Sequence, residues 1–485
     1  MIGKGATSSC TVGLFFFVLS QCNAAFYDIA QNQDVQIGVS WGGLDSDTDT
    51  LFTGGAKSGS DANPEVGCGL LVTRDNGSHW DLSKPGGGAY ANPFTLAFAV
   101  ASNKNNKSSS VVCAAGLSSA WCAQDTSSRE STVFLRAPIL HPNGTSGQFE
   151  DVKWEPATGS SGGDGIFQVT GQFGTNENWT NGIAVSTDDA TTWTLRSVRG
   201  VTVPTFASST PSAATWYTTA NSAPSTDDDS DAAAFSPRPP RRLRRLARFL
   251  GAEKWAELWR ASGGGPAEEE EEEEKRKEEA GGSRRQEDPP PAPPANYVGE
   301  VAKTTDGGET WEILLRNDGG AEGGANFTFD DIHCFDEETC IVAANGGCGP
   351  STQNTCDGSQ PQNMGGAVWV TVDGGATWAE TLRDDADSSF GFSNLRMVGA
   401  REVFAVGGGV TVTRSSGVHL WHTVNVTDAS AWRMTLVDEA TAQLSMGLDV
   451  QPATGEVAIN FIQKGALCGV VRGFADDQQP AGGGH

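Results

Sequence analysis

A short pattern that ends in tryptophan recurs along this chain and constrains its fold more than any other feature. The pattern is Ser/Thr-x-Asp-x-Gly-x-x-Trp, and its clearest copies read TRDNGSHW, STDDATTW, TTDGGETW and TVDGGATW. The positions that define these copies are Thr73, Asp75, Gly77 and Trp80; Ser186, Asp188 and Trp193; Thr304, Asp306, Gly308 and Trp311; and Thr371, Asp373, Gly375 and Trp378. In a tight turn, the aspartate and hydroxyl accept backbone N–H groups, and glycine adopts a positive φ. The tryptophan then begins a strand and buries a large ring. We therefore interpret the pattern as a folding device.

The spacing of the copies predicts a repeated β-sheet unit. Weaker copies are expected at Thr413, where Ser415 replaces the aspartate and Trp421 comes one position late, and at Thr126, where only the threonine is kept. Once an unusual segment between the second and third clear copies is removed, the period is about 40 to 60 residues, which is typical of propeller blades of four antiparallel strands. Short apolar runs precede the copies, and little helical periodicity is present. The fold class is therefore predicted to be all-β, as a single β-propeller.

The number of units predicts seven blades, with six or eight as alternatives. Six pattern positions are followed by a terminal unit, 432–473, that lacks the pattern. The segment 26–39 is expected to complete the last blade, because closing the ring removes exposed sheet edges. The propeller should then comprise 26–223 and 296–475.

The segment 224–295 is predicted to be a low-complexity, mostly disordered insertion. It contains charge runs and proline clusters, with seven consecutive glutamates from Glu268 to Glu274. Within it, 241–260 could form a basic amphipathic helix that binds a membrane surface or a partner. The alternatives are a solvated insertion or untranslated sequence carried into the chain.

The first 25 residues resemble a secretory signal peptide, with Lys4, an apolar run and small residues Ala24 and Ala25. No other apolar run reaches the roughly 20 residues of a membrane helix, so no transmembrane segment is expected. Beyond the leader, the cysteines are even in number, which favours disulfides over free buried thiols. They are Cys68, Cys113, Cys122, Cys334, Cys340, Cys348, Cys356 and Cys468. Three pairs are close in sequence (113 with 122, 334 with 340, and 348 with 356), which leaves 68 with 468.

Six N-glycosylation sequons agree with passage through the secretory pathway. They begin at Asn76, Asn106, Asn143, Asn178, Asn326 and Asn425. We expect a secreted or lumenal protein, with a plastid reached through a bipartite signal as the alternative.

The charge and the scarcity of metal-binding patterns exclude several classes of function. The formal net charge is −27, and an acidic surface repels nucleic acid. The histidines form no metal spacing, no phosphate loop or nucleophile elbow is found, and the acidic stretch 45–49 lacks the glycine and final glutamate of a calcium loop. We therefore expect no metal and no cofactor.

The clear copies resemble the BNR or Asp-box repeat family, which includes sialidases, xyloglucan hydrolases and photosystem II assembly propellers. The resemblance implies a propeller fold and three kinds of function. Our leading hypothesis is a non-catalytic scaffold, as a monomer, that binds a protein or glycan at the mouth of the channel. The alternatives are a glycoside hydrolase and a photosystem II assembly or stability factor. A sialidase of the family carries Phe/Tyr-Arg-Ile-Pro before the first copy, and the nearest match here is Phe134-Leu-Arg-Ala-Pro138, after that copy.

Overall fold

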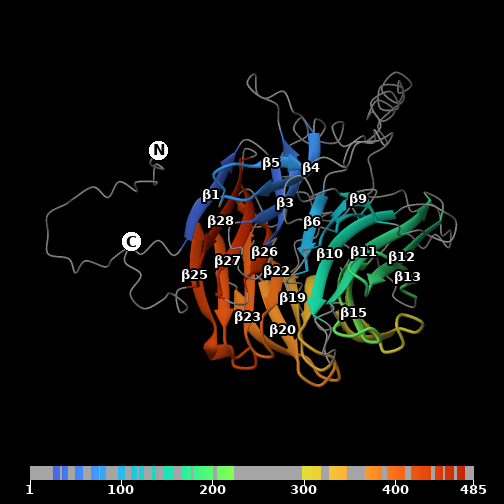
Figure 1. Ribbon diagram of the computed structural model, residues 1–485. Helices are drawn as coiled ribbons and strands as arrows, with labels where there is room; N and C mark the ends of the chain where they lie inside the picture. The colour runs from blue at the N-terminus through green and yellow to red at the C-terminus, as the bar shows by residue number, and fades with distance from the viewer. Residues whose placement is uncertain are drawn as a thin grey trace, which may run out of the picture.

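The computed structural model describes residues between 26 and 475, with internal gaps (Figure 1). The described segments are 26–32, 35–41, 50–57, 67–75, 77–83, 97–103, 111–116, 120–124, 134–137, 139, 147–156, 165–175, 178–199, 205–222, 298–317, 327–346, 366–384, 390–409, 417–438, 443–451, 454–463 and 467–475. The predicted leader 1–25 and the predicted insertion 224–295 lie outside these segments, so both stay predictions.

The described chain is an all-β propeller, as the sequence predicts. Its strands form seven four-stranded antiparallel sheets. The first three sheets, in chain order, are β2 (Val35–Trp41), β3 (Leu51–Lys57), β4 (Gly67–Thr73) and β5 (Asp81–Ser83); β6 (Ala97–Ser102), β7 (Val112–Gly116), β8 (Ala120–Ala123) and β9 (Leu135–Arg136); and β10 (Gly147–Pro156), β11 (Gly165–Thr175), β12 (Asn178–Ser186) and β13 (Thr194–Ser197).

The remaining four sheets repeat this arrangement. Sheets four and five are β14 (Thr205–Ser209), β15 (Trp216–Ser222), β16 (Val298–Thr304) and β17 (Glu312–Asn317); and β18 (Phe327–Cys334), β19 (Cys340–Gly346), β20 (Gly366–Thr371) and β21 (Ala379–Asp384). Sheets six and seven are β22 (Phe390–Met397), β23 (Val403–Gly409), β24 (Val418–Thr423) and β25 (Arg433–Asp438); and β26 (Gln443–Val450), β27 (Val457–Gln463), β28 (Leu467–Gly473) and β1 (Phe26–Asn32). A 3-10 turn, η1 (Ala429–Ala431), precedes β25.

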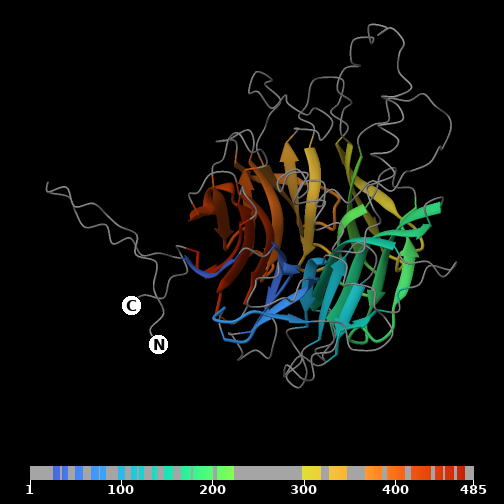
Figure 2. The same cartoon turned by 90° about the horizontal axis from the view of Figure 1, so that it is seen from above.

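The first strands of the sheets form a closed inner ring. β2 contacts β6, β6 contacts β10, and the contacts continue through β14, β18, β22 and β26 back to β2. Chain order therefore follows the ring, which the colours of Figures 1 and 2 trace from blue to red. We call these seven strands the inner strands.

The ring is closed by the N-terminal strand. β1 pairs antiparallel with β28, as Figure 1 shows, and so supplies the outer strand of the last sheet. The predicted closing segment 26–39 is thus right for 26–32 but wrong for its end, because 35–41 is the inner strand of the first sheet. The terminal unit likewise begins at β26 and not at Trp432, which precedes β25 in sheet six.

Every inner strand skips one residue in its pairing with the second strand of its sheet. The skips lie at Gly38, Phe98, Glu150, Phe206, Asp330, Ser393 and Met446. Such bulges bend a strand and increase its twist. Because the bulge occurs in the first strand of all seven sheets, it belongs to the repeated unit.

The core lies between neighbouring sheets. One apolar cluster of the described residues, for example, combines Cys113 of sheet two and the preceding Val111 with Phe149 and Val152 of sheet three. Because each sheet is covered on both faces, its strands read as short apolar runs of alanine and valine. Within the described segments, no helix has the length and apolarity needed to cross a membrane.

Candidate functional site

The four clear copies of the tryptophan pattern form the turns between the third and fourth strands of their sheets. In each turn, the hydroxyl donates to the aspartate two positions later, at 3.0 Å for Thr73, 2.8 Å for Ser186, 2.7 Å for Thr304 and 2.8 Å for Thr371. The same hydroxyl accepts the N–H of the residue four positions later. The sequence interpretation of these residues as turn-forming groups agrees with this bonding. We call these four turns the box turns.

Each aspartate is also bonded to a residue just before the tryptophan. In the two sheets where glycines are paired, Thr310 donates both N–H and hydroxyl to Asp306, and Thr377 does so to Asp373. The hydroxyl bond is the main cause that lowers the pKa of Asp306, and its counterpart lowers the pKa of Asp373 to about 2. The carboxylates of the box aspartates therefore accept hydrogen bonds within their own turns and hold the backbone of those turns.

The box turns need backbone of positive φ at the fifth position. Gly77, Gly308 and Gly375 have φ of 82°, 89° and 94°, whereas the third-sheet copy places Ala190 there, with φ 63°. An L-residue with a side chain is strained in this region. Ala190 and its neighbour Asp189, with φ 53°, therefore make the third-sheet box turn the strained copy.

Sequence reasoning misplaced one copy of the pattern. Thr413 and Ser415 lie outside the described residues, and Trp421 lies within β24, where it cannot follow a turn. The turn after β24 instead begins at Thr423, whose hydroxyl accepts the N–H of Asn425, while Thr427 donates to Asn425 Oδ1 at 3.0 Å. Asparagine replaces aspartate here, and η1 delays the tryptophan to position 432, which hid the copy. The copy expected at Thr126 lies outside the described residues.

The tryptophans of the box turns pack between sheets. Trp311 packs against Ile166 and Ile183 of sheet three and against Val198, which follows β13. The centroid of its ring is 6.5 Å from that of Trp216. The other three, Trp80, Trp193 and Trp378, are half-buried against separate apolar clusters. These side chains therefore join the sheets to one another.

Charged side chains of the inner strands bind one another across the ring. Lys153 of β10 reaches past sheet four, and its Nζ lies 2.5 Å from Asp331 Oδ1 of β18 and 3.4 Å from Asp151 Oδ2. Asp331 Oδ2 in turn accepts the N–H of Leu395 on β22 at 2.8 Å. Lys153 and Asp331 are 3% and 0% exposed, so this network is sealed from solvent.

The network continues around the ring through further polar contacts. Arg396 of β22 lies 3.8 Å from Asp449 of β26, and Asp449 accepts the hydroxyl of Ser40 on β2 at 3.3 Å. Ser40 also contacts Ser102 of β6 at 3.1 Å. On the other side, Ser209 of β14 accepts the N–H of Cys334 on β18. All seven inner strands are thus linked by polar side chains, and we call this set the inner-strand network.

Glu155 is the unusual carboxyl of the inner-strand network. It is 1% exposed, and it accepts the Ser209 hydroxyl and the Thr210 N–H, each at 2.5 Å. Burial raises the pKa of Glu155 to about 7, although the two hydrogen bonds and the charge of Lys153 oppose this shift. A carboxyl of this pKa suits general acid catalysis, but Glu155 is closed to substrate by its burial.

The described inner strands do not contain the arginine cluster of a sialidase. Sialidase chemistry would bring three arginines together, yet Arg396 is the sole arginine within the seven described inner strands. The buried carboxylates Asp151 and Asp331 face the buried cation Lys153, and Asp449 faces the partly exposed Arg396. Among the described residues, no group of three or more potential ligands is placed to hold a metal ion.

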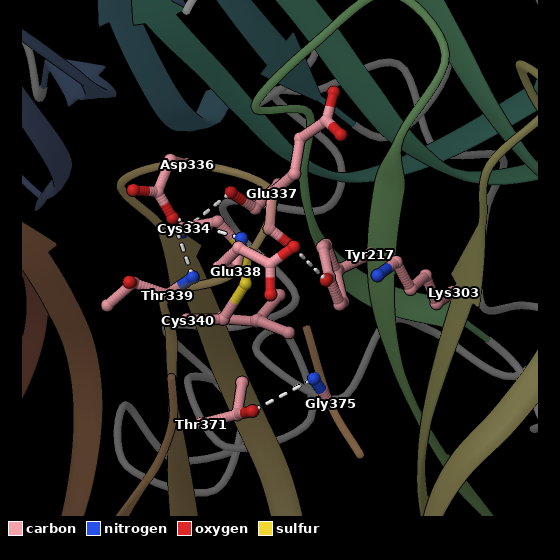
Figure 3. The surroundings of a disulfide bond; sticks show 12 residues. Tyr217, Lys303, Cys334, Asp336, Glu337, Glu338, Thr339, Cys340, Thr371 and Gly375 are labelled. Atoms are coloured by element: carbon pink, nitrogen blue, oxygen red, sulfur yellow. Dashed lines mark hydrogen bonds between the residues drawn. A yellow bond between two sulfur atoms is a disulfide. The ribbon is translucent and has the colours of Figure 1, made fainter. Parts of the chain in front are cut away.

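Within the described residues, two disulfides are formed, and Figure 3 shows the hairpin that carries the second of them. Cys334 and Cys340 are paired directly across β18 and β19, as Cys113 and Cys122 are across β7 and β8. Beside the hairpin, Tyr217 donates its hydroxyl to Glu337 O at 2.7 Å. Burial, followed by the surrounding carboxylates, raises the pKa of this phenol well above its usual value.

The remaining predicted disulfides and the predicted glycosylation sites are not tested by any contact among the described residues. Cys68 lies on β4 and Cys468 on β28, while Cys348 and Cys356 lie outside the described residues, so these two disulfides stay predictions. Of the sequon asparagines, Asn178 begins β12 and Asn425 lies in the turn after β24; Asn76, Asn106, Asn143 and Asn326 lie outside the described residues.

Comparisons with known proteins find solved structures of low similarity and no protein family. No model of a protein family matches the chain, and no curated protein does. Among solved structures, YCF48 bound to D1 peptide is similar at a TM-score of 0.45 and 12% identity, over 93% of this chain and 95% of that chain. The GH74 xyloglucanase of Xanthomonas campestris gives 0.41 and 11%, over 90% of this chain and 59% of that chain. The α-L-arabinofuranosidase of Fusarium graminearum gives 0.40 and 12%, over 77% and 91%. These identities carry no inference about ligand or activity.

Proposed function

We propose that this chain is a non-catalytic Asp-box propeller that binds a protein or glycan ligand with surface turns and loops. One observation carries the proposal. Lys153, Asp151 and Asp331 of the inner strands are buried and form ion pairs with one another. A hydrolase needs a carboxyl pair open to its substrate, whereas a binding scaffold needs only a stiff body that presents its surface.

The repeated turns support the same proposal. The hydroxyl, aspartate and glycine of each turn hydrogen-bond within the turn and hold its backbone, as Thr304, Asp306 and Gly308 do. We accordingly propose that the turns are Asp-boxes, that the seven sheets are the blades of a seven-bladed propeller, and that 26–223 and 296–475 form one domain. We further propose a monomer in a secretory lumen or outside the cell, with glycans on exposed sequons.

Two parallel screens of the full chain test the proposal. The chain is assayed with chromogenic α-sialosides, xyloglucan oligosaccharides and arabinofuranosides, and it is applied to glycan and peptide arrays. We expect binding to one class of array ligand with no turnover of any glycoside. Turnover of any of these glycosides contradicts the proposal. Absence of binding on both arrays also contradicts it.

A further inference from the structure

Two adjacent turns of sheet five form a projection that carries exposed apolar side chains. Phe335 follows β18, and Val372 is the second residue of the box turn after β20. They are 39% and 55% exposed, and they belong to only six large apolar side chains that are exposed among the described residues. The two turns lie at the same end of the sheet, because Gly374 N donates to Glu338 O at 2.9 Å. We call residues 335–339 and 371–375 the acidic projection.

The acidic projection is held rigid from several sides. The disulfide of Cys334 and Cys340 closes the base of the hairpin, and Asp336 accepts the N–H groups of Glu338 and Thr339 at 3.0 and 2.7 Å. Tyr217 of sheet four donates to Glu337 O, as Figure 3 shows. A surface that is ordered before binding loses less conformational entropy when a partner docks. An exposed phenylalanine on so constrained a hairpin is therefore suited to recognition.

The charge of the acidic projection is of one sign. Asp336, Glu337, Glu338 and Asp373 lie in these two turns, which contain no lysine or arginine. Within the described part of the chain, neither glutamate forms an ion pair. One cation from outside the two turns, Lys303 of β16, contacts the projection through its backbone: its Nζ donates to Gly374 O at 2.9 Å and lies 5.1 Å from the ring centroid of Tyr217.

The neighbouring sheet also carries an exposed apolar side chain in one of its turns. Val424 occupies the same position in the turn after β24 as Val372 does in its box turn, and it is 64% exposed. In sheets one, three and four, the corresponding residues are polar: Arg74, Thr187 and Thr305. Among the described turns of this kind, exposed valine therefore occurs at this position in two adjacent sheets, which contact each other through β21 and η1.

We propose that the acidic projection and Val424 bind a cationic segment of a partner protein, in which lysine or arginine alternates with apolar residues. The apolar side chains of the segment would contact Phe335 and Val372, and its cations would pair with Glu337 and Glu338. Complementary charge gives such an interface its orientation, and alternate residues of an extended peptide provide two faces. This inference rests on the proposed function, and it selects protein over glycan as the ligand.

The probe for the test is the labelled octapeptide Lys-Phe-Arg-Leu-Lys-Val-Arg-Leu, titrated into the full chain and followed by fluorescence anisotropy. One control peptide has every cation replaced by glutamate, and the other has every apolar residue replaced by serine. We expect binding of the probe alone. In the chain, Glu337→Lys with Glu338→Lys should weaken binding at least about tenfold, as should Phe335→Ser. The matched control is Glu312→Lys, which changes an exposed acid on β17 and should leave affinity unchanged.

The outcomes separate this inference from the proposed function. Equal loss from Glu312→Lys and from the projection variants would mean that net charge attracts the probe, and the inference fails. If the array ligands bind the projection variants as tightly as they bind the parent chain, the inference is wrong but the proposed binding function is retained. If replacing Arg244 and Arg245 by Glu in the full chain raises probe affinity about tenfold, the occupant is the chain's own basic segment and a separate partner is overturned. Unchanged thermal unfolding of each variant shows that the fold is intact.

Discussion

Two neighbouring glycines in the fourth-sheet box turn should respond very differently to the same substitution. Gly307 and Gly308 both have positive φ, 69° and 89°, so alanine at either is strained by about 1 kcal/mol. A methyl group on Gly307 would have no atom closer than 3.6 Å, from Ala213 O. A methyl group on Gly308 would lie 2.7 Å from Trp216 Cζ3 and 2.8 Å from Arg196 Cβ. Overpacking adds about 1–3 kcal/mol, so Gly308→Ala should cost about 2–4 kcal/mol against about 1 for Gly307→Ala.

Equilibrium unfolding in urea, followed by far-ultraviolet circular dichroism, measures the difference. We expect a small fall in midpoint for Gly307→Ala and a fall two- to fourfold larger for Gly308→Ala, with equal slopes. The fifth sheet repeats the experiment, because a methyl group on Gly374 meets the end of the flexible Lys303 side chain, Nζ, at 3.0 Å, whereas on Gly375 it meets Leu314 Cδ1 at 2.2 Å. Equal losses at both glycines of a pair would refute the argument that these turns are wedged against the neighbouring sheet.

Three further predictions concern the buried groups. The pKa of Glu155 in the folded chain, about 7, lies above the ordinary glutamate value of 4.5, so the folded chain binds more protons than the unfolded chain between these pH values. The free energy of unfolding of the parent chain should therefore fall by roughly 3 kcal/mol as pH rises across this window. Glu155→Gln should remove this pH dependence. Urea midpoints measured from pH 4.5 to 8 check this, and a variant whose midpoint changes with pH as much as that of the parent chain contradicts it. Lys153→Ala should cost about 3–5 kcal/mol, because Asp331 is left as an unpaired buried charge; the double change Lys153→Met with Asp331→Asn should recover most of that loss in the same assay. Ala190→Gly should raise the free energy of unfolding by about 0.5–1 kcal/mol by relieving positive φ, and a fall would mean that the buried methyl group contributes more than the strain costs.

The fold was predictable because its signal is local and repeated. A turn such as 304–311 needs hydroxyl, aspartate and glycine at fixed spacing, whatever surrounds it, and the Thr304 hydroxyl and Asp306 carboxylate bond to groups of that same turn. The copy at Thr423 escaped for the same reason: once Asn425 replaces the aspartate and η1 delays the tryptophan, the spacing is lost although the bonding is kept. Prediction from a spaced pattern therefore fails where an insertion falls inside the pattern.

The inner-strand network could not be predicted in the same way, because its contacts join residues that are remote in sequence. Lys153 and Asp331 are separated by 178 positions, and their contact depends on how far each sheet rotates about the ring. One signal was nevertheless present: charged residues stand within apolar first strands, as Asp151, Lys153 and Glu155 do in a single strand. A buried charge is tolerated only when it is paired, so such residues on strands that share one ring must find partners across it. Which strand supplies each partner follows from the geometry of the closed ring, and that geometry lets these buried side chains hold the inner strands together.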